Sequence, residues 1–168
     1  MTNEDKINNW FKKFEHRLHA DVPDIVAYTA STYFKERFKY ENWDNVPWKQ
    51  LNPKYKAKKT RGKERILYAS SNLQASIHPS TISPARVTIS AGNAKVPYAR
   101  IHNEGLRVVG NFKVKAYTNT DFMGKGKPRK IKAHTRRVNY KMPKRQFMGH
   151  SAFLNAIIKD RLINNFNK

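Results

Sequence analysis

The sequence contains no cysteine, which excludes a disulfide framework, a thiolate nucleophile and a cysteine zinc site. It also lacks a run of about 18 apolar residues, so we expect no membrane-spanning helix and no membrane partner. The first residues, Met-Thr-Asn-Glu-Asp, lack the basic and apolar segments of a signal peptide. These absences suit a protein that is made and used in a cytoplasm.

Acidic residues become scarce along the chain. Only four follow residue 48: Glu64, Glu104, Asp121 and Asp160. A two-metal nuclease site relies on clustered carboxylates, which this spacing does not predict. The sequence also has no His-Glu-x-x-His pair, no phosphate-binding glycine motif and no Gly-x-Ser-x-Gly elbow. We therefore expect no catalytic site, no metal and no cofactor.

Positive charge is abundant, with a formal net charge of +22 over 168 residues. Residues 1–48 hold seven basic and eight acidic side chains, whereas residues 49–65 hold eight and one, and residues 111–145 hold twelve and one. Such a field favours contact with nucleic acid, an acidic protein surface or anionic lipid. A basic composition that serves only solubility is the alternative, and the concentration into two segments argues against it.

The length predicts a single domain over residues 1–168. We divide it into a helical part (1–40), a basic loop (41–65), a sheet with a projecting hairpin at 106–140 (66–149) and a C-terminal helix (150–168). The basic loop contains several turn residues, and a solvated loop is compatible with a nucleic-acid contact there.

Two amphipathic helices are predicted at the N-terminus. The first spans residues 3–19, capped by Thr2 or Asn3, and its apolar residues share one stripe: Ile7, Trp10, Phe11, Phe14 and Leu18. Residues 21–24 are expected to end it and to start a second helix that reaches about Tyr40, with Pro23 in its first turn. Core-facing stripes are expected for both helices, and a subunit contact through the first stripe is the alternative.

Antiparallel strands are predicted next. Leu73, Ala75 and Ile77 alternate with polar residues, residues 79–84 form a turn, and alternation resumes at Val87 and Ile89. Residues 106–140 predict a long hairpin with a bulge or bend at Gly110 and another irregularity near residues 134–137. We expect an α+β fold: two N-terminal helices, an antiparallel sheet of about four strands, and a C-terminal helix, capped by Ser151, packed on the sheet.

The long hairpin carries the predicted contact residues: Lys113, Lys115, Lys125, Lys127, Arg129, Lys130, Lys132, Arg136 and Arg137. Cations at this spacing can follow a phosphate backbone without reading bases. Few aromatic residues lie between them, so base stacking is not indicated. The hairpin could instead dock on an acidic neighbouring protein.

Residues 96–105 are dense in unlike residue types. Pro97 restricts the backbone, and Gly105 permits the positive φ that ends a short helical turn. His102 and Glu104 are polar groups in this turn. They could form an acid–base pair, although we expect their side chains to tie the turn to neighbouring backbone. A zinc deaminase site is excluded because it needs two thiolates.

Two motifs, Tyr98-Ala-x-Ile-His-x-x-Gly105 and Met142–Gly149, resemble the paired motifs of phage virion morphogenesis (tail-completion) proteins. The second motif usually reads Pro-Ala-Arg-x-Phe-Leu-Gly. The residues that match it are Pro143, Arg145, Phe147 and Gly149. Trp48-Lys-Gln-Leu51 and the Ile66–Ile77 segment also match in order. Ser71 stands where the family commonly has glycine, so that turn could differ.

The resemblance implies a structural protein of the phage neck or tail, made in the host bacterial cytoplasm and carried in the virion. Such proteins form rings, often of six subunits, that contact connector or tail-tube proteins and let DNA pass. The implied structural motif comprises Tyr98, His102, Glu104, Gly105, Pro143, Arg145, Phe147 and Gly149. The alternatives are a non-specific nucleic-acid-binding protein of low oligomeric state and a small nuclease that uses His102 and Glu104.

Overall fold

The structure is a computed structural model that describes residues 2–53, 65–68, 70–120 and 128–167. Its elements follow in the order α1 (Asn3–His16), η1 (Arg17–Asp21), α2 (Val22–Tyr40), β1 (Asn42–Trp43), β2 (Val46–Pro47), α4 (Asn72–Ala75), β3 (His78–Ser83), β4 (Arg86–Ser90), α5 (Ala99–Glu104), β5 (Arg107–Val114), β6 (Tyr117–Asn119), β7 (Arg129–Ile131), β8 (His134–Lys141) and α6 (Ala152–Phe166). The α+β class is confirmed. Within the described residues the strands pair two by two, as β1–β2, β3–β4, β5–β8 and β6–β7, all antiparallel.

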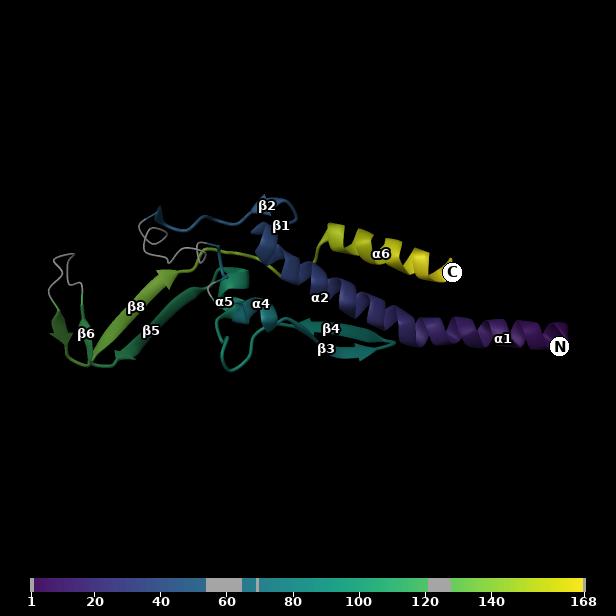
Figure 1. Cartoon of the computed structure of the whole chain (residues 1–168), viewed down its shortest axis with the longest axis horizontal. Helices are drawn as coiled ribbons and strands as arrows, with labels where there is room; N and C mark the ends of the chain where they lie inside the picture. Colours follow the sequence, from purple (N-terminus) through teal and green to yellow (C-terminus); the bar gives the residue numbers. More distant parts are fainter. Residues whose placement is uncertain (1, 54–64, 69, 121–127, 168) are drawn as a thin grey trace.

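The N-terminal helices run on without the predicted break. Residues 17–21 form a π-helical turn (η1), in which the Val22 N–H bonds to the Arg17 carbonyl five residues back. A π-turn is one of the places where a helix adjusts its backbone hydrogen bonds, and Pro23, which lacks an N–H, lies two residues after its end. Because the chain does not turn back here, α1 extends away from the body (Figure 1). The second helix does begin in the predicted segment, at Val22 with Pro23 in its first turn, but it continues the first helix through η1 instead of following a break.

The apolar stripe of α1 does not face the core, which corrects our expectation for this helix. None of its residues is buried. Trp10 and Phe14 stack at a centroid distance of 5.3 Å, and Phe14 also contacts Phe166 of α6 at 5.8 Å. The predicted Thr2 cap is confirmed, since its hydroxyl accepts from the Asp5 N–H while the Asp5 carboxylate accepts from the Thr2 N–H.

The core forms around α2, as predicted for the second helix. Tyr33, Phe34 and Phe38 are buried on it. The buried residues packed with them come from the rest of the chain: Trp48, Ile66, Leu73, Ile77, Val96, Ala99, Phe147 and Leu154. Trp43 stacks on Phe34 at 6.1 Å, so the β1–β2 hairpin is also fixed to this helix. The helix ends at Tyr40, followed by Glu41 in the left-handed conformation.

The first hairpin is displaced from its predicted position. The segment that contains Leu73 and Ala75 forms the single helical turn α4, and the first strand is β3, which includes Pro79. Residues 73 and 77 are four apart, a spacing that is compatible with a helix and also with the alternation of a strand. Ser71 adopts φ 57°, so the chain keeps here the left-handed backbone for which glycine is favoured.

The long hairpin is present as two ladders, β5–β8 and β6–β7. The β5–β8 register is continuous from Arg107–Lys141 to Val114–His134, so the predicted irregularities at Gly110 and at residues 134–137 are absent. The interruption falls between the two ladders, at residues 115–116 and 132–133. Figure 1 shows the ladders projecting from the body at the end opposite to α1.

The C-terminal helix α6 is confirmed, and its cap is Ser151, whose hydroxyl accepts from the Leu154 N–H at 3.1 Å. It packs along α2 rather than on a sheet (Figure 1). Because the strands form narrow pairs, no broad sheet face is available to cover it. The β3–β4 hairpin also contacts α2, so this helix lies between α6 and the hairpin.

Candidate functional site

The two sequence motifs lie against each other and form what we call the motif junction, residues 98–105 and 142–149. The first motif is the short helix α5, which Tyr98 precedes and Gly105 ends with φ 70°. A Cβ added at Gly105 would lie 2.8 Å from both the Cβ and the N atom of Lys144. Glycine is therefore required twice, by the positive φ and by the close approach of the second motif.

Asn103 joins the two motifs, and sequence reasoning missed it. Its Oδ1 atom accepts hydrogen bonds from the Phe147 N–H at 2.9 Å and the Met148 N–H at 3.0 Å. The Arg145 N–H also donates to the His102 carbonyl at 2.8 Å. The second motif belongs to none of the strand pairs among the described residues, so these bonds satisfy backbone groups that no ladder satisfies there. An amide inside a glycine-ended turn was the only signal for this role in the sequence.

The second motif is also fixed to the 43–51 segment. The Arg145 side chain is buried, and its Nε and Nη2 atoms donate to the Lys49 carbonyl at 3.1 and 3.0 Å. Burial lowers the pKa of Arg145, and the Glu41 carboxylate partly opposes that shift. Trp48 Nε1 donates to the Gln146 carbonyl at 2.7 Å, which orders the loop between Arg145 and Phe147.

Phe147 is the apolar anchor of the junction. It is 1% exposed, and its ring lies 5.1 Å from the ring of Phe38 on α2. Pro143 is half-buried in the same loop. Gly149 has φ 147°, and a Cβ there would lie 2.6 Å from the Gln146 side-chain nitrogen. The motif residues therefore connect α5 to the central helix.

His102 and Glu104 do not tie the turn to neighbouring backbone, and this expectation was wrong. Glu104 is exposed and pairs with Arg100 at 2.9 Å. His102 packs edge-on against Tyr98, and its Nδ1 atom is buried without a hydrogen-bond partner in the described structure. Burial, with a smaller effect of Arg145, lowers the pKa of His102, which favours the neutral ring. No hydrogen bond joins the two side chains as an acid–base pair would require.

A hollow of about 560 Å³ opens beside the junction. Its lining is mainly apolar and aromatic: Leu51, Leu67, Tyr68, Ser70, Leu73, Tyr98, His102, Tyr140, Met142 and Arg145. No carboxylate is among these residues, and the described part of the chain contains no group of three or more residues that could hold a metal ion. The lining therefore lacks the groups of a metal-dependent nuclease.

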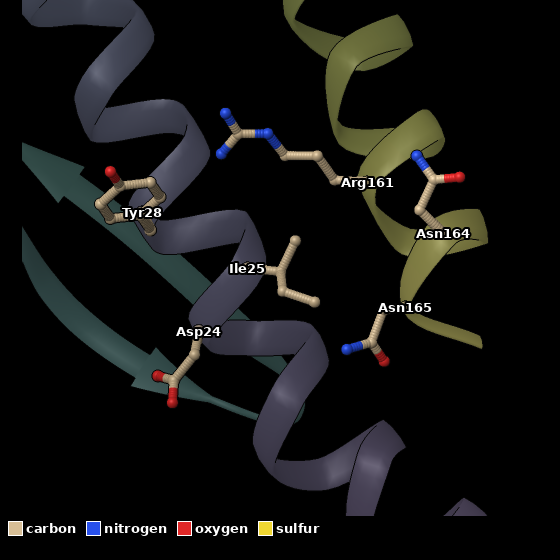
Figure 2. Close-up of a pocket in the computed structure, with 6 residues that line it drawn as sticks. All are labelled: Asp24, Ile25, Tyr28, Arg161, Asn164 and Asn165. Carbon is tan, nitrogen blue, oxygen red and sulfur yellow. The ribbon is translucent and has the colours of Figure 1, made fainter. Parts of the chain in front are cut away.

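A second hollow of about 450 Å³ lies between α2 and α6. Figure 2 shows Arg161 reaching from α6 towards α2, and Ile25 directed into the space between the helices. The Arg161 guanidinium donates to the Thr29 hydroxyl at 3.1 Å and lies 5.7 Å from the Tyr28 ring. Because Arg161 already has these partners, the hollow is a packing groove between two helices.

The predicted contact residues lie on the projecting ladders. Six of them are exposed and form no ion pair within the described residues: Lys113, Lys115, Lys130, Lys132, Arg136 and Arg137. Arg129 is exposed on β7. Lys125 and Lys127 lie outside the described residues. The ladders therefore place cations at one end of the molecule, remote from α1.

The β5–β8 register separates the side chains of this hairpin into two faces. On one face Arg107 pairs with Lys141, Asn111 with Arg137, and Lys113 with Thr135. On the other face Val108 pairs with Tyr140, Phe112 with Arg136, and Val114 with His134. The remaining pairs are Val109 with Asn139 on the first face and Gly110 with Val138 on the second. The first face is therefore mainly polar and cationic apart from the exposed Val109, whereas the second is mainly apolar apart from Arg136 and His134.

In the described residues we find no helix that is both long and apolar enough to span a membrane.

Searches of curated proteins and of solved structures found no match to this chain. A sequence model of the phage virion morphogenesis family matches residues 3–167, nearly the whole chain. This family consists of structural or assembly proteins, which gives the chain a role in building the virion and implies contact with other phage structural proteins. The chain therefore belongs to the phage virion morphogenesis family.

Proposed function

We propose that this protein is a tail-completion or head–tail connector (neck) protein, which forms a ring that joins or terminates the tail and lets DNA pass. The chain acts as one domain without catalysis. The motif residues Tyr98, His102, Glu104, Gly105, Pro143, Arg145, Phe147 and Gly149 form and flank the turn and loop that hold the body together. The projecting ends contact neighbouring subunits, connector or tail-tube proteins, and the DNA.

The observation that carries this proposal is the apolar surface that is exposed, in the part of the chain that the structure describes, at both ends of a member of a virion family. The rings of Trp10 and Phe11 are each 58% exposed on α1, and Phe112 is 52% exposed on the hairpin. Large contiguous apolar patches on soluble proteins mark interaction sites. An assembly protein needs such surfaces, whereas an enzyme that acts alone does not.

The test is the solution mass of the chain by light scattering at low and high salt. We expect a discrete ring that persists at high salt, since apolar contacts are not screened by ions. A parallel sample contains tail or neck proteins of the same phage, because a joint protein can assemble only on its partner. A chain that stays monomeric in all these samples, and associates with neither head nor tail proteins, would contradict the proposal.

The second candidate is a non-specific nucleic-acid-binding protein of low oligomeric state. It is favoured by six exposed cations of the hairpin that form no ion pair within the described residues: Lys113, Lys115, Lys130, Lys132, Arg136 and Arg137. Adding duplex DNA to the light-scattering samples separates the two candidates. A monomer that binds DNA with an affinity falling steeply with salt supports the second, because each neutralised phosphate contributes about −0.9 to the slope of log K against log salt.

A further inference from the structure

Two apolar surfaces are largely uncovered within the described residues, apart from the contact of Phe14 with Phe166, and they lie at opposite ends of the molecule (Figure 1). The first, which we call the α1 stripe, comprises Ile7, Trp10, Phe11, Phe14 and Leu18. The second, which we call the hairpin face, comprises Val108, Phe112, Val114, Val138 and Tyr140. Because the two ends are far apart, one copy cannot cover its own stripe with its own hairpin.

The α1 stripe leaves aromatic surface in solvent. An aromatic side chain can bury about 150–250 Å², so the three partly exposed rings leave roughly 300 Å² uncovered. The largest apolar patch on a monomer reaches about this size and is often functional. No residue of α1 is buried, so this part of the continuous helix gains little from packing within the chain. Contact with another chain would stabilise it.

The hairpin face also leaves aromatic side chains exposed to solvent. The described part of β5–β8 is a two-stranded ladder with no third strand, and such a hairpin is marginally stable in water. Phe112 is 52% exposed and Tyr140 is 45% exposed on this face. A helix laid across the ladder would cover both rings and give the two strands a second layer.

The charges on one edge of the α1 stripe complement those of the hairpin face, whereas Lys13 and Arg17 lie beside Trp10 and Phe14 on its other edge. Glu4 and Glu15 are eleven residues apart, which is about three helical turns, so they form one edge next to Phe11. On the hairpin face Arg136 lies directly opposite Phe112. Within the described residues neither carboxylate forms an ion pair, and Arg136 has none either.

We propose that the α1 stripe of one copy packs against the hairpin face of the next copy, with Arg136 beside the Glu4–Glu15 edge. This proposal rests on the ring of the proposed function and specifies which surfaces form it. The contact is head-to-tail, so each copy uses one surface on each neighbour, and repetition closes a ring if the rotation between copies allows it.

The test uses two full-length variants, Phe11→Glu in the α1 stripe and Phe112→Glu in the hairpin face. Each replaces an exposed ring by a charge, and each alone is expected to remain monomeric. The first variant retains an intact hairpin face and the second an intact α1 stripe. An equimolar mixture should therefore form a heterodimer with one intact contact, seen as a doubling of the mass.

Two matched controls introduce the same glutamate on the opposite side of the same helix or strand. Asn9→Glu lies on the side of α1 away from the stripe, and Val109→Glu lies on the other face of β5 at a similar exposure to Phe112. Both should assemble like the natural chain. Thermal unfolding of all four variants should match that of the monomer, because each site is exposed.

Charge reversal adds a test of orientation. Glu15→Arg and Arg136→Glu should each raise the dissociation constant of the contact by at least about tenfold, and the double variant should restore it. A double variant no better than either single variant would overturn the proposed pairing.

Other outcomes separate this inference from the proposed function. A Phe112→Glu variant that still dimerises while Phe11→Glu does not would indicate α1 pairing with α1, and would overturn the proposal. Rings formed by both variants would overturn it while leaving the ring function intact. A natural chain that never associates with itself would remove the ring and the pairing together.

Discussion

The motif junction and the projecting ends use similar residues for opposite purposes. Phe147 at the junction is 1% exposed, whereas Phe112 on the hairpin is 52% exposed. Asn103 accepts two backbone hydrogen bonds across the junction, whereas Lys113 and Arg136 of the hairpin form no ion pair within the described residues. The junction thus stabilises the isolated chain, and the ends have surface that we propose a neighbour buries.

The largest expected effect compares these two phenylalanines. Phe147→Ala removes a buried ring that contacts Phe38, and should lower the free energy of unfolding by about 3–5 kcal/mol. Phe112→Ala should change it by less than about 0.5 kcal/mol, because the ring is half in solvent. Urea denaturation of the monomer measures both. Equal losses would remove the distinction between the two regions.

Two glycines give the next comparison. Gly105→Ala places a Cβ 2.8 Å from Lys144 backbone at a positive φ, and we expect a loss of about 2–4 kcal/mol. Gly110→Ala on the hairpin has its nearest contact at 3.4 Å, from Phe112. It should be neutral or stabilising by up to about 1 kcal/mol. Melting temperatures that fall equally in the two variants would contradict the close packing at Gly105.

The role of Asn103 is tested by a conservative pair. Asn103→Ala leaves the Phe147 and Met148 N–H groups without their acceptor, and should cost about 2–3 kcal/mol. Asn103→Asp retains an acceptor oxygen and should preserve most of the stability. Asn111→Ala on the exposed face of the hairpin is the control. If the aspartate variant is as unstable as the alanine variant, acceptance by Oδ1 is not what Asn103 contributes.

The smallest expected effect is a pH dependence at His102. Its pKa lies below the ordinary value of 6.5 in the folded chain, mainly because of burial. The unfolded chain therefore binds more protons here as the pH falls below about 6.5, and the free energy of unfolding decreases. His102→Gln should flatten this slope, which cannot exceed about 1.4 kcal/mol per pH unit for one group. A free energy of unfolding with the same pH slope in the natural chain and in His102→Gln would contradict this assignment.

The fold class, the central helix and the Ser151-capped last helix were predictable because their apolar spacings are long and regular. The position of the first helix in the sequence was predicted correctly. Its expected packing against the core was wrong. Hydrophobic periodicity indicates that a helix has an apolar side. It does not indicate whether another part of the chain packs against that side. Pro23 in the first turn of a helix is compatible with a new helix and also with one that continues from a π-turn, so the sequence alone favoured the commoner arrangement.

The two segments of the motif junction could be predicted from the sequence, but the hydrogen bonds between them could not. Gly105 indicated a turn end, and its φ of 70° confirms this. The polar residues on either side of Asn103 attracted attention through their chemistry, yet the structural bond belongs to Asn103 itself. The hydrogen bonds between the Asn103 side chain and the backbone of the second motif join two segments some forty residues apart. A local sequence pattern contains no information on such a pairing.

The most direct test of this account is hydrogen–deuterium exchange of the chain as a monomer and in its assembled form. We predict slow exchange at the motif junction in both states. Amides of α1 and of β5–β8 should exchange rapidly in the monomer and become protected on assembly. Unchanged exchange in both projecting elements on assembly would contradict the claim that these ends form the contacts between subunits.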